Sequence, residues 1–150
     1  MNTTFATMTI AVLMLLYLAV DGVAQTGPPP LPNPVIYLIG QEPYSTGGKS
    51  YIRYRYDVFN SASYPDALFA AAPALPPCGA NSNSSRTWVD LFDQRGKRLN
   101  GFCALGKSEK LSSIWFALPE NEVPPSWIYI ELNDRLTGTK YKSNLAETTN

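Results

Sequence analysis

Apolar and polar positions alternate along most of the chain after residue 34, and turn residues separate the alternating segments. The clearest segment is 51–59, where Ile52, Tyr54, Tyr56 and Val58 share one face. An alternation with a period of two predicts a strand with one buried and one solvated face. Six further segments have the length and composition of strands: 35–39, 87–92, 97–105, 112–118, 127–132 and 139–144.

The turn signals divide these segments. Residues 93–96 and 135–138 each end in glycine and predict tight turns, whereas Asn100-Gly101 is either a bulge or the true hairpin turn. Residues 60–86 are irregular and proline-rich, with one short helical turn expected within 66–72. The pattern predicts an all-β fold, an antiparallel two-sheet sandwich of about seven strands over residues 35–145. Residues 146–150 are expected to be a frayed polar tail.

Residues 51–144 resemble a fibronectin type III or immunoglobulin-like domain. The segment 112–119, the loop after it, the segment 127–132 and the strand from Thr139 look like the last three strands of such a domain. Trp88 falls where these folds often place a core tryptophan. The resemblance implies an immunoglobulin-like sandwich that serves in adhesion, spacing or binding.

The N-terminal segment predicts export. An apolar run over residues 9–20 is followed by the small-residue sequence Gly22-Val23-Ala24, which is typical of a signal peptide that occupies residues 1–24. The alternative is a retained membrane anchor formed by residues 9–20. Residues 25–34 predict a stiff proline-rich spacer. A secreted, periplasmic or cell-surface location is therefore expected, and membrane attachment only if the leader is retained.

Composition narrows the chemistry. The chain contains no histidine, which excludes a Ser-His-Asp triad, a Cys-His dyad and histidine-ligated metals. In an oxidising compartment its two cysteines, Cys78 and Cys103, are expected to form one disulfide. The 12 basic and 12 acidic side chains are dispersed, so no nucleic-acid partner is expected. The sequence gives no reason to expect a cofactor or a metal.

Aromatic side chains are the main candidate binding residues. Trp88, Trp115, Trp127 and Tyr129 lie out of phase with the buried faces of their strands, and exposed rings of this kind stack on sugars or anchor a protein partner. Asn83 begins a glycosylation sequon in the polar loop. Carboxylates near predicted turns and strand ends leave open a glycoside hydrolase that uses two of them: Asp90, Asp93, Glu120, Glu122, Glu131 and Asp134.

These observations favour an exported, non-catalytic binding or structural module whose partner is an unidentified protein or glycan. The alternative is a small carbohydrate-binding module that uses exposed tryptophan and tyrosine. A carboxylate-based hydrolase is the third hypothesis, and the absence of a catalytic signature argues against it.

Overall fold

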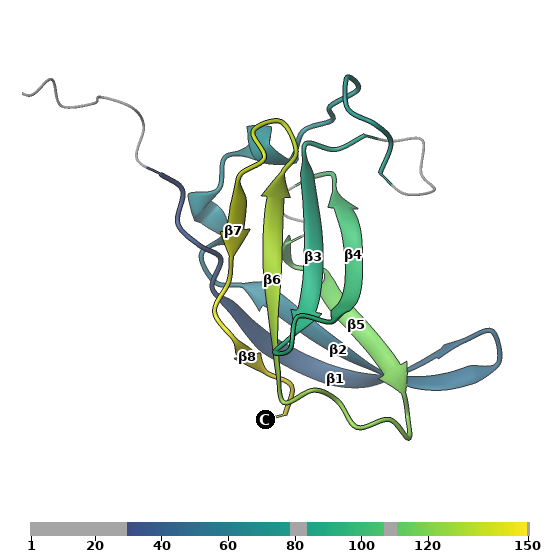
Figure 1. Ribbon diagram of the computed structural model, residues 1–150. Coiled ribbons are helices and arrows are strands. Elements are labelled where there is room, and N and C mark those ends of the chain that lie inside the picture. Colours follow the sequence, from purple (N-terminus) through teal and green to yellow (C-terminus); the bar gives the residue numbers. More distant parts are fainter. Residues whose placement is uncertain (1–29, 79–83, 107–110, 150) are drawn as a thin grey trace, which may run out of the picture. The chain divides into compact units, whose positions relative to one another are not determined.

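The computed structural model describes residues 30–78, 84–106 and 111–149, and its compact unit begins at Leu31 (Figure 1). The described residues form eight strands and two single-turn 3-10 helices. The strands are β1 (Ile36–Thr46), β2 (Lys49–Val58), β3 (Thr87–Asp93), β4 (Arg98–Ala104), β5 (Ile114–Pro119), β6 (Trp127–Asp134), β7 (Lys140–Lys142) and β8 (Ala146–Glu147). The helices are η1 (Ser61–Ser63) and η2 (Asp66–Phe69), and η2 supplies the helical turn expected within 66–72.

Two antiparallel sheets make up this unit. The first sheet has the order β1-β2-β5, and the second has the order β4-β3-β6-β7 with β8 paired to β6 (Figure 1). The predicted all-β architecture with two antiparallel sheets is confirmed. The structure has one strand more than expected, because a short eighth strand follows β7.

The core lies between the inner faces of the two sheets. The predicted buried face of β2 is confirmed, since Tyr54, Tyr56 and Val58 are buried. Tyr54 and Tyr56 stack on Phe116 of β5, with ring centroids 4.9 and 6.2 Å apart. Burial raises the pKa of the Tyr56 phenol, whose hydroxyl still donates a hydrogen bond to the Glu147 carbonyl. The second sheet contributes five fully buried aliphatic side chains: Val89, Leu91, Ile128, Ile130 and Leu132.

Strand β1 is longer than the apolar run that predicted it. A register shift between Leu38 and Gly40 marks a bulge, and the strand continues past Gly40 to Thr46. Gly47 and Gly48 then form the turn into β2 with positive φ angles of 56° and 72°. Because β5 pairs with β2 only from Tyr51 onward, the end of this hairpin projects beyond β5 (Figure 1).

The second hairpin settles the ambiguous Asn100-Gly101 pair. The turn lies at residues 93–96, where Gly96 has a φ of 82°, and Gly101 lies inside β4. Asn100 pairs with Leu91 and Arg98 pairs with Phe92, so Leu99 is the extra residue of a bulge. The reading of Asn100-Gly101 as the hairpin turn is therefore wrong.

Asparagine side chains join the edges of the two sheets where backbone pairing does not close them. The Asn144 amide accepts a hydrogen bond from the Ile36 N–H at 2.8 Å and donates one to the Ile36 carbonyl at 3.1 Å. At the opposite edge of the first sheet, Asn100 of β4 donates to the Trp115 carbonyl of β5 at 2.8 Å. Each side-chain amide forms hydrogen bonds with backbone groups of an edge strand that have no neighbouring strand to pair with.

The frayed C-terminal tail is a wrong expectation for residues 146–149. Strand β8 pairs with Trp127 and Ile128, and Ala146 fills part of the core. Thr148 is fully buried, and its hydroxyl donates to the Pro125 carbonyl. The polar composition of residues 146–149 gave no sign of burial. They can be buried because the Thr148 hydroxyl and the backbone form hydrogen bonds inside the domain.

Part of the proline-rich segment also lies against the domain. Leu31 packs on the core, and the Tyr64 hydroxyl donates to the Pro32 carbonyl at 2.6 Å. The Asn60 side chain donates to the Asn33 carbonyl at 2.9 Å and accepts from the Val35 N–H at 2.9 Å. Residues 31–34, expected in the spacer, are therefore held against the domain by the Leu31 side chain and by the carbonyl groups of Pro32 and Asn33.

Candidate functional site

The four predicted binding aromatics do not gather in one place. Trp115 lies on the outer face of the first sheet, while Trp88 and Tyr129 lie on the outer face of the second. Trp127 begins β6 and is 39% exposed. Among the described ring contacts, no contact joins two of these four side chains.

Trp88 is not a core residue, which corrects the placement implied by the resemblance. The alternation of β3 buries its neighbour Val89 and turns Trp88 to the outer face. The indole Nε1 donates to Asp90 Oδ1 at 2.7 Å, and the Arg98 guanidinium carbon lies 5.4 Å from the ring centroid. An indole on a solvated face keeps a polar partner in this way.

Asp90 is the centre of a polar cluster on the same face. Its carboxylate also accepts hydrogen bonds from Arg98 Nε at 2.6 Å and Asn133 Nδ2 at 3.2 Å. Gly101 makes room for this cluster, because a Cβ there would lie 2.0 Å from Arg98 Nη2. The residues of this cluster come from β3, β4 and β6. All of the hydrogen bonds described for the Asp90 carboxylate come from donors within the chain.

Cations also lie over two of the other candidate rings, Tyr129 and Trp115. Lys142 Nζ is 4.0 Å from the centroid of Tyr129, which stacks on Phe92. On the first sheet, the Arg53 guanidinium lies 5.0 Å from the Trp115 centroid and 4.0 Å from the Tyr44 centroid. A sugar that stacked on these ring faces would have to displace the cation. Sequence reasoning missed Tyr44, because β1 was expected to end before it.

A different group of exposed side chains is apolar, and its members come from β1 and from segments that neighbour it. We call it the apolar patch, and its six residues are Val35, Tyr37, Ile39, Phe59, Trp127 and Leu145, all at least 39% exposed. Val35 and Phe59 are joined by a backbone hydrogen bond of 2.8 Å, and Ile39 follows Tyr37 on β1. Tyr37, Trp127 and Leu145 line one groove, which connects the first sheet to β6 and the segment before β8.

The groove of the apolar patch has a volume of about 330 Å³. Glu147 is the charged residue among its described lining residues: Ile36, Tyr37, Leu38, Trp127, Leu145, Ala146, Glu147 and Thr149. At its margin, the Tyr37 hydroxyl donates to Asp57 Oδ2 at 3.4 Å, and the Asp57 carboxylate raises the pKa of the Tyr37 phenol. The patch is therefore apolar with an acidic margin.

A second hollow brings together two of the predicted carboxylates. Asp93 and Glu122 both line a depression of about 320 Å³ between the β3–β4 turn and the β5–β6 loop. Asp93 Oδ1 accepts the N–H groups of Arg95 and Lys97, each at 2.8 Å. Asp93 therefore caps its turn, which is the ordinary structural use of an aspartate at this position.

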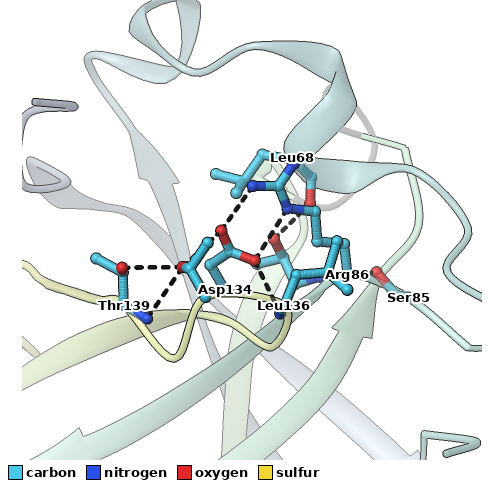
Figure 2. Close-up of polar contacts among 8 residues, drawn as sticks. Leu68, Ser85, Arg86, Asp134, Leu136 and Thr139 are labelled. Atoms are coloured by element: carbon cyan, nitrogen blue, oxygen red, sulfur yellow. Dashed lines mark hydrogen bonds and ion pairs between the residues drawn. The ribbon is translucent and has the colours of Figure 1, made fainter. Parts of the chain in front are cut away.

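Asp134, another predicted carboxylate, is buried in an ion pair (Figure 2). Arg86 Nε and Nη2 donate to its two oxygens at 2.9 and 2.7 Å, and the Thr137 hydroxyl and the Leu136 N–H add 2.9 and 3.1 Å bonds. The Arg86 hydrogen bonds are the main cause that lowers the Asp134 pKa to about 2. This pair fastens residues 84–86 to the β6–β7 turn.

The predicted disulfide between Cys78 and Cys103 is confirmed, with a Cα–Cα distance of 5.8 Å. It ties the irregular segment before β3 to β4. Asn83 of the sequon lies outside the described residues. Within the residues that the structure describes, no cluster of three or more potential metal ligands occurs, and no helix has the length and apolar character to cross a membrane.

Comparison with known proteins gives no further identification. No family model matches the chain, and no curated protein or solved structure is significantly similar to it. The functional argument therefore rests on the surface chemistry of the domain.

Proposed function

We propose that the chain is an exported, non-catalytic module that binds a protein partner through the apolar patch. The observation that carries this proposal is a groove lined by three large exposed apolar side chains, Tyr37, Trp127 and Leu145. The other exposed apolar side chains of the patch lie on or beside β1: Val35, Ile39 and Phe59. Large contiguous apolar patches are uncommon on monomeric soluble proteins and mark interaction sites. Trp127 and Tyr37 are also of the residue types that anchor protein interfaces.

The strand order supports an immunoglobulin-like identity for the module. In immunoglobulin-like sandwiches the second strand pairs with E, and the C strand pairs with F, which pairs with G. Here β2 pairs with β5, β3 pairs with β6, and β6 pairs with β7. The fourth strand pairs with β3, which places it in the sheet that contains C, F and G.

The chemistry of the groove indicates the kind of partner. Its lining is mainly apolar, and Glu147 and the nearby Asp57 give the margin negative charge. A complementary partner presents aliphatic or aromatic side chains flanked by lysine or arginine, because opposite charges at an interface margin steer association. A nucleic acid, with its anionic backbone, does not fit this margin.

Two further observations support the absence of catalysis and the export of the chain. Asp90, Asp93 and Asp134 all accept hydrogen bonds that hold their own strands or turns. The Cys78–Cys103 disulfide suits an oxidising compartment, in agreement with a signal peptide over residues 1–24. If residues 9–20 are retained instead, the same domain is tethered to a membrane.

Carbohydrate binding on the outer face of the second sheet is the second candidate. It is favoured by the position of Trp88 beside Asp90 and Asn133, a ring with polar groups of the kind that bind sugar hydroxyls. The cations over the rings argue against it, because a glycan must displace them.

A parallel screen separates the two candidates. The mature protein is immobilised and presented with a random peptide library and a glycan array, alongside the variants Leu145→Asp and Asp90→Asn. We expect the library to yield peptides rich in apolar and basic residues. The Asp90→Asn variant should still bind these peptides, and the Leu145→Asp variant should not. Glycan binding that Asp90→Asn abolishes and Leu145→Asp leaves intact would replace the protein-binding proposal.

A further inference from the structure

The two sulfurs of the disulfide lie in different surroundings. Cys78 is 5% exposed, whereas Cys103 is partly exposed and pairs with Trp88 in the second sheet. Because residues paired across two strands lie on the same face, Cys103 lies with Trp88 on the outer face of that sheet, toward solvent. Cys103 is therefore the cysteine of the pair that the structure leaves more open to an incoming reagent.

A cation lies directly against the less accessible sulfur. Arg135 Nη1 donates to Cys78 Sγ at 3.0 Å, and the Ser85 N–H donates to the same atom at 3.4 Å. The guanidinium is held in place by the Ser85 carbonyl at 3.0 Å and the Pro76 carbonyl at 2.7 Å. A positive charge and hydrogen-bond donors in contact with a sulfur stabilise its thiolate form.

We propose that the Cys78–Cys103 bond is a thiol–disulfide exchange site, attacked at Cys103 by an external dithiol. In the first step a thiolate of the dithiol forms a bond to Cys103 Sγ, the Cys78–Cys103 bond breaks, and Cys78 leaves as a thiolate that takes up a proton from water. In the second step the other thiol of the reagent, as its thiolate, forms a bond to the reagent sulfur attached to Cys103, the mixed disulfide breaks, and Cys103 leaves as a thiolate that takes up a proton from water. The dithiol is oxidised to its disulfide, and both cysteines are reduced.

Arg135 acts in this scheme as a positioning residue that stabilises the leaving thiolate. Exchange is faster when the leaving sulfur is the better-stabilised thiolate, so the cation accelerates bond cleavage. Contacts of the same segment also favour re-formation of the disulfide. Arg135 still bonds to Pro76, and the Ala72 N–H still donates to the Ser84 carbonyl at 2.9 Å, so the reduced Cys78 stays near β4. Opening the bond therefore frees one side-chain link without removing the backbone contacts.

Mapping of the first adduct tests the direction of attack on the unmodified protein. The folded mature chain is exposed briefly to glutathione, quenched with acid, alkylated and analysed by peptide mass spectrometry. We expect glutathione on Cys103 and the alkyl label on Cys78. Glutathione on Cys78, with the label on Cys103, would overturn the proposal.

The role of Arg135 is tested by the rate of reduction with dithiothreitol. We expect Arg135→Gln to slow the second-order rate about tenfold and Arg135→Lys, which keeps the charge, to stay within about threefold of the original protein. Arg95→Gln, at an exposed turn arginine, is the matched control and should leave the rate unchanged. If Arg135 only braced the segment, its removal would expose the bond and speed reduction, so an unchanged or faster rate rejects the positioning role.

Discussion

The buried pair of Arg86 and Asp134 should make the stability of the protein depend on acid pH. Asp134 is 3% exposed, and its pKa falls from 3.8 to about 2, chiefly through hydrogen bonds from Arg86 (Figure 2). The substitution Asp134→Asn keeps the size of the side chain and removes the group that titrates. The difference in unfolding free energy between the two proteins therefore reports the carboxylate.

The expected magnitude follows from linkage between protonation and folding. A carboxyl group with this change in pKa contributes about 2.5 kcal/mol to stability at neutral pH. The folded pKa is the lower one, so the contribution is complete above the unfolded pKa near 4 and is lost as the pH falls through about 2. At pH 7, Asp134→Asn should cost about 3 kcal/mol, since breaking a buried pair typically costs about 3–5 and Arg86 is partly solvated.

Urea unfolding followed by tryptophan fluorescence between pH 7 and pH 2.5 measures this difference. The gap between the original protein and Asp134→Asn should shrink by about 1.6 kcal/mol over that range, because about 0.8 kcal/mol of the contribution is left at pH 2.5. Glu122→Gln, at an exposed carboxylate, is the control and should have little effect at any pH. A gap for Asp134→Asn that stays constant from pH 7 to pH 2.5 would refute the assignment of the acid-sensitive group.

Three further changes test individual parts of the structure by chemical or thermal unfolding. Thr148→Val should destabilise the protein by about 1 kcal/mol because it removes the hydrogen bond from the buried hydroxyl to the partly buried Pro125 carbonyl; no loss would mean that the C-terminal segment is not docked. Gly101→Ala should cost about 1–3 kcal/mol, because the added Cβ would lie 2.0 Å from Arg98 Nη2, which can move, and 2.7 Å from Asp90 Oδ1, which hydrogen bonds hold in place; no loss would mean that the cluster around Asp90 rearranges without cost. Replacing Cys78 and Cys103 by alanine should cost about 3–4 kcal/mol for a loop closed over 25 residues, and an unchanged melting temperature would contradict a structural contribution from the bond.

Local alternation was enough to predict the central strands. The period of two in β2, the glycine turn at 93–96 and the cysteine pair all have local or compositional signals, and the structure confirms them. The extent of β1 could not be predicted in the same way. Gly40 reads as a strand end, but the bulge beside it lets pairing with β2 continue. The docking of Thr148 depends on a carbonyl of the β5–β6 loop and has no local signal.

The candidate site was harder to predict for a related reason. In the run 35–39 every residue is apolar, so the sequence does not distinguish the buried Ile36 from the exposed Val35 and Tyr37. Only the pairing of β1 in the sheet decides which side chains face solvent. For Trp88 and Tyr129 the strand phase predicted the outward direction correctly. It could not predict that cations from neighbouring strands lie over the faces of both rings.

The central claim is that the apolar patch binds a protein partner, and a pair of matched variants tests it most directly. Leu145 lies in the patch and is 51% exposed, whereas Leu136 is 57% exposed and lies past the other end of β6, roughly 25 Å away. Each leucine is replaced by aspartate, and the affinity for the best peptide from the library screen is measured by isothermal titration calorimetry. We expect Leu145→Asp to weaken binding at least tenfold, about 1.4 kcal/mol or more, and Leu136→Asp to bind like the original protein. Equal affinities for the two variants would contradict the claim.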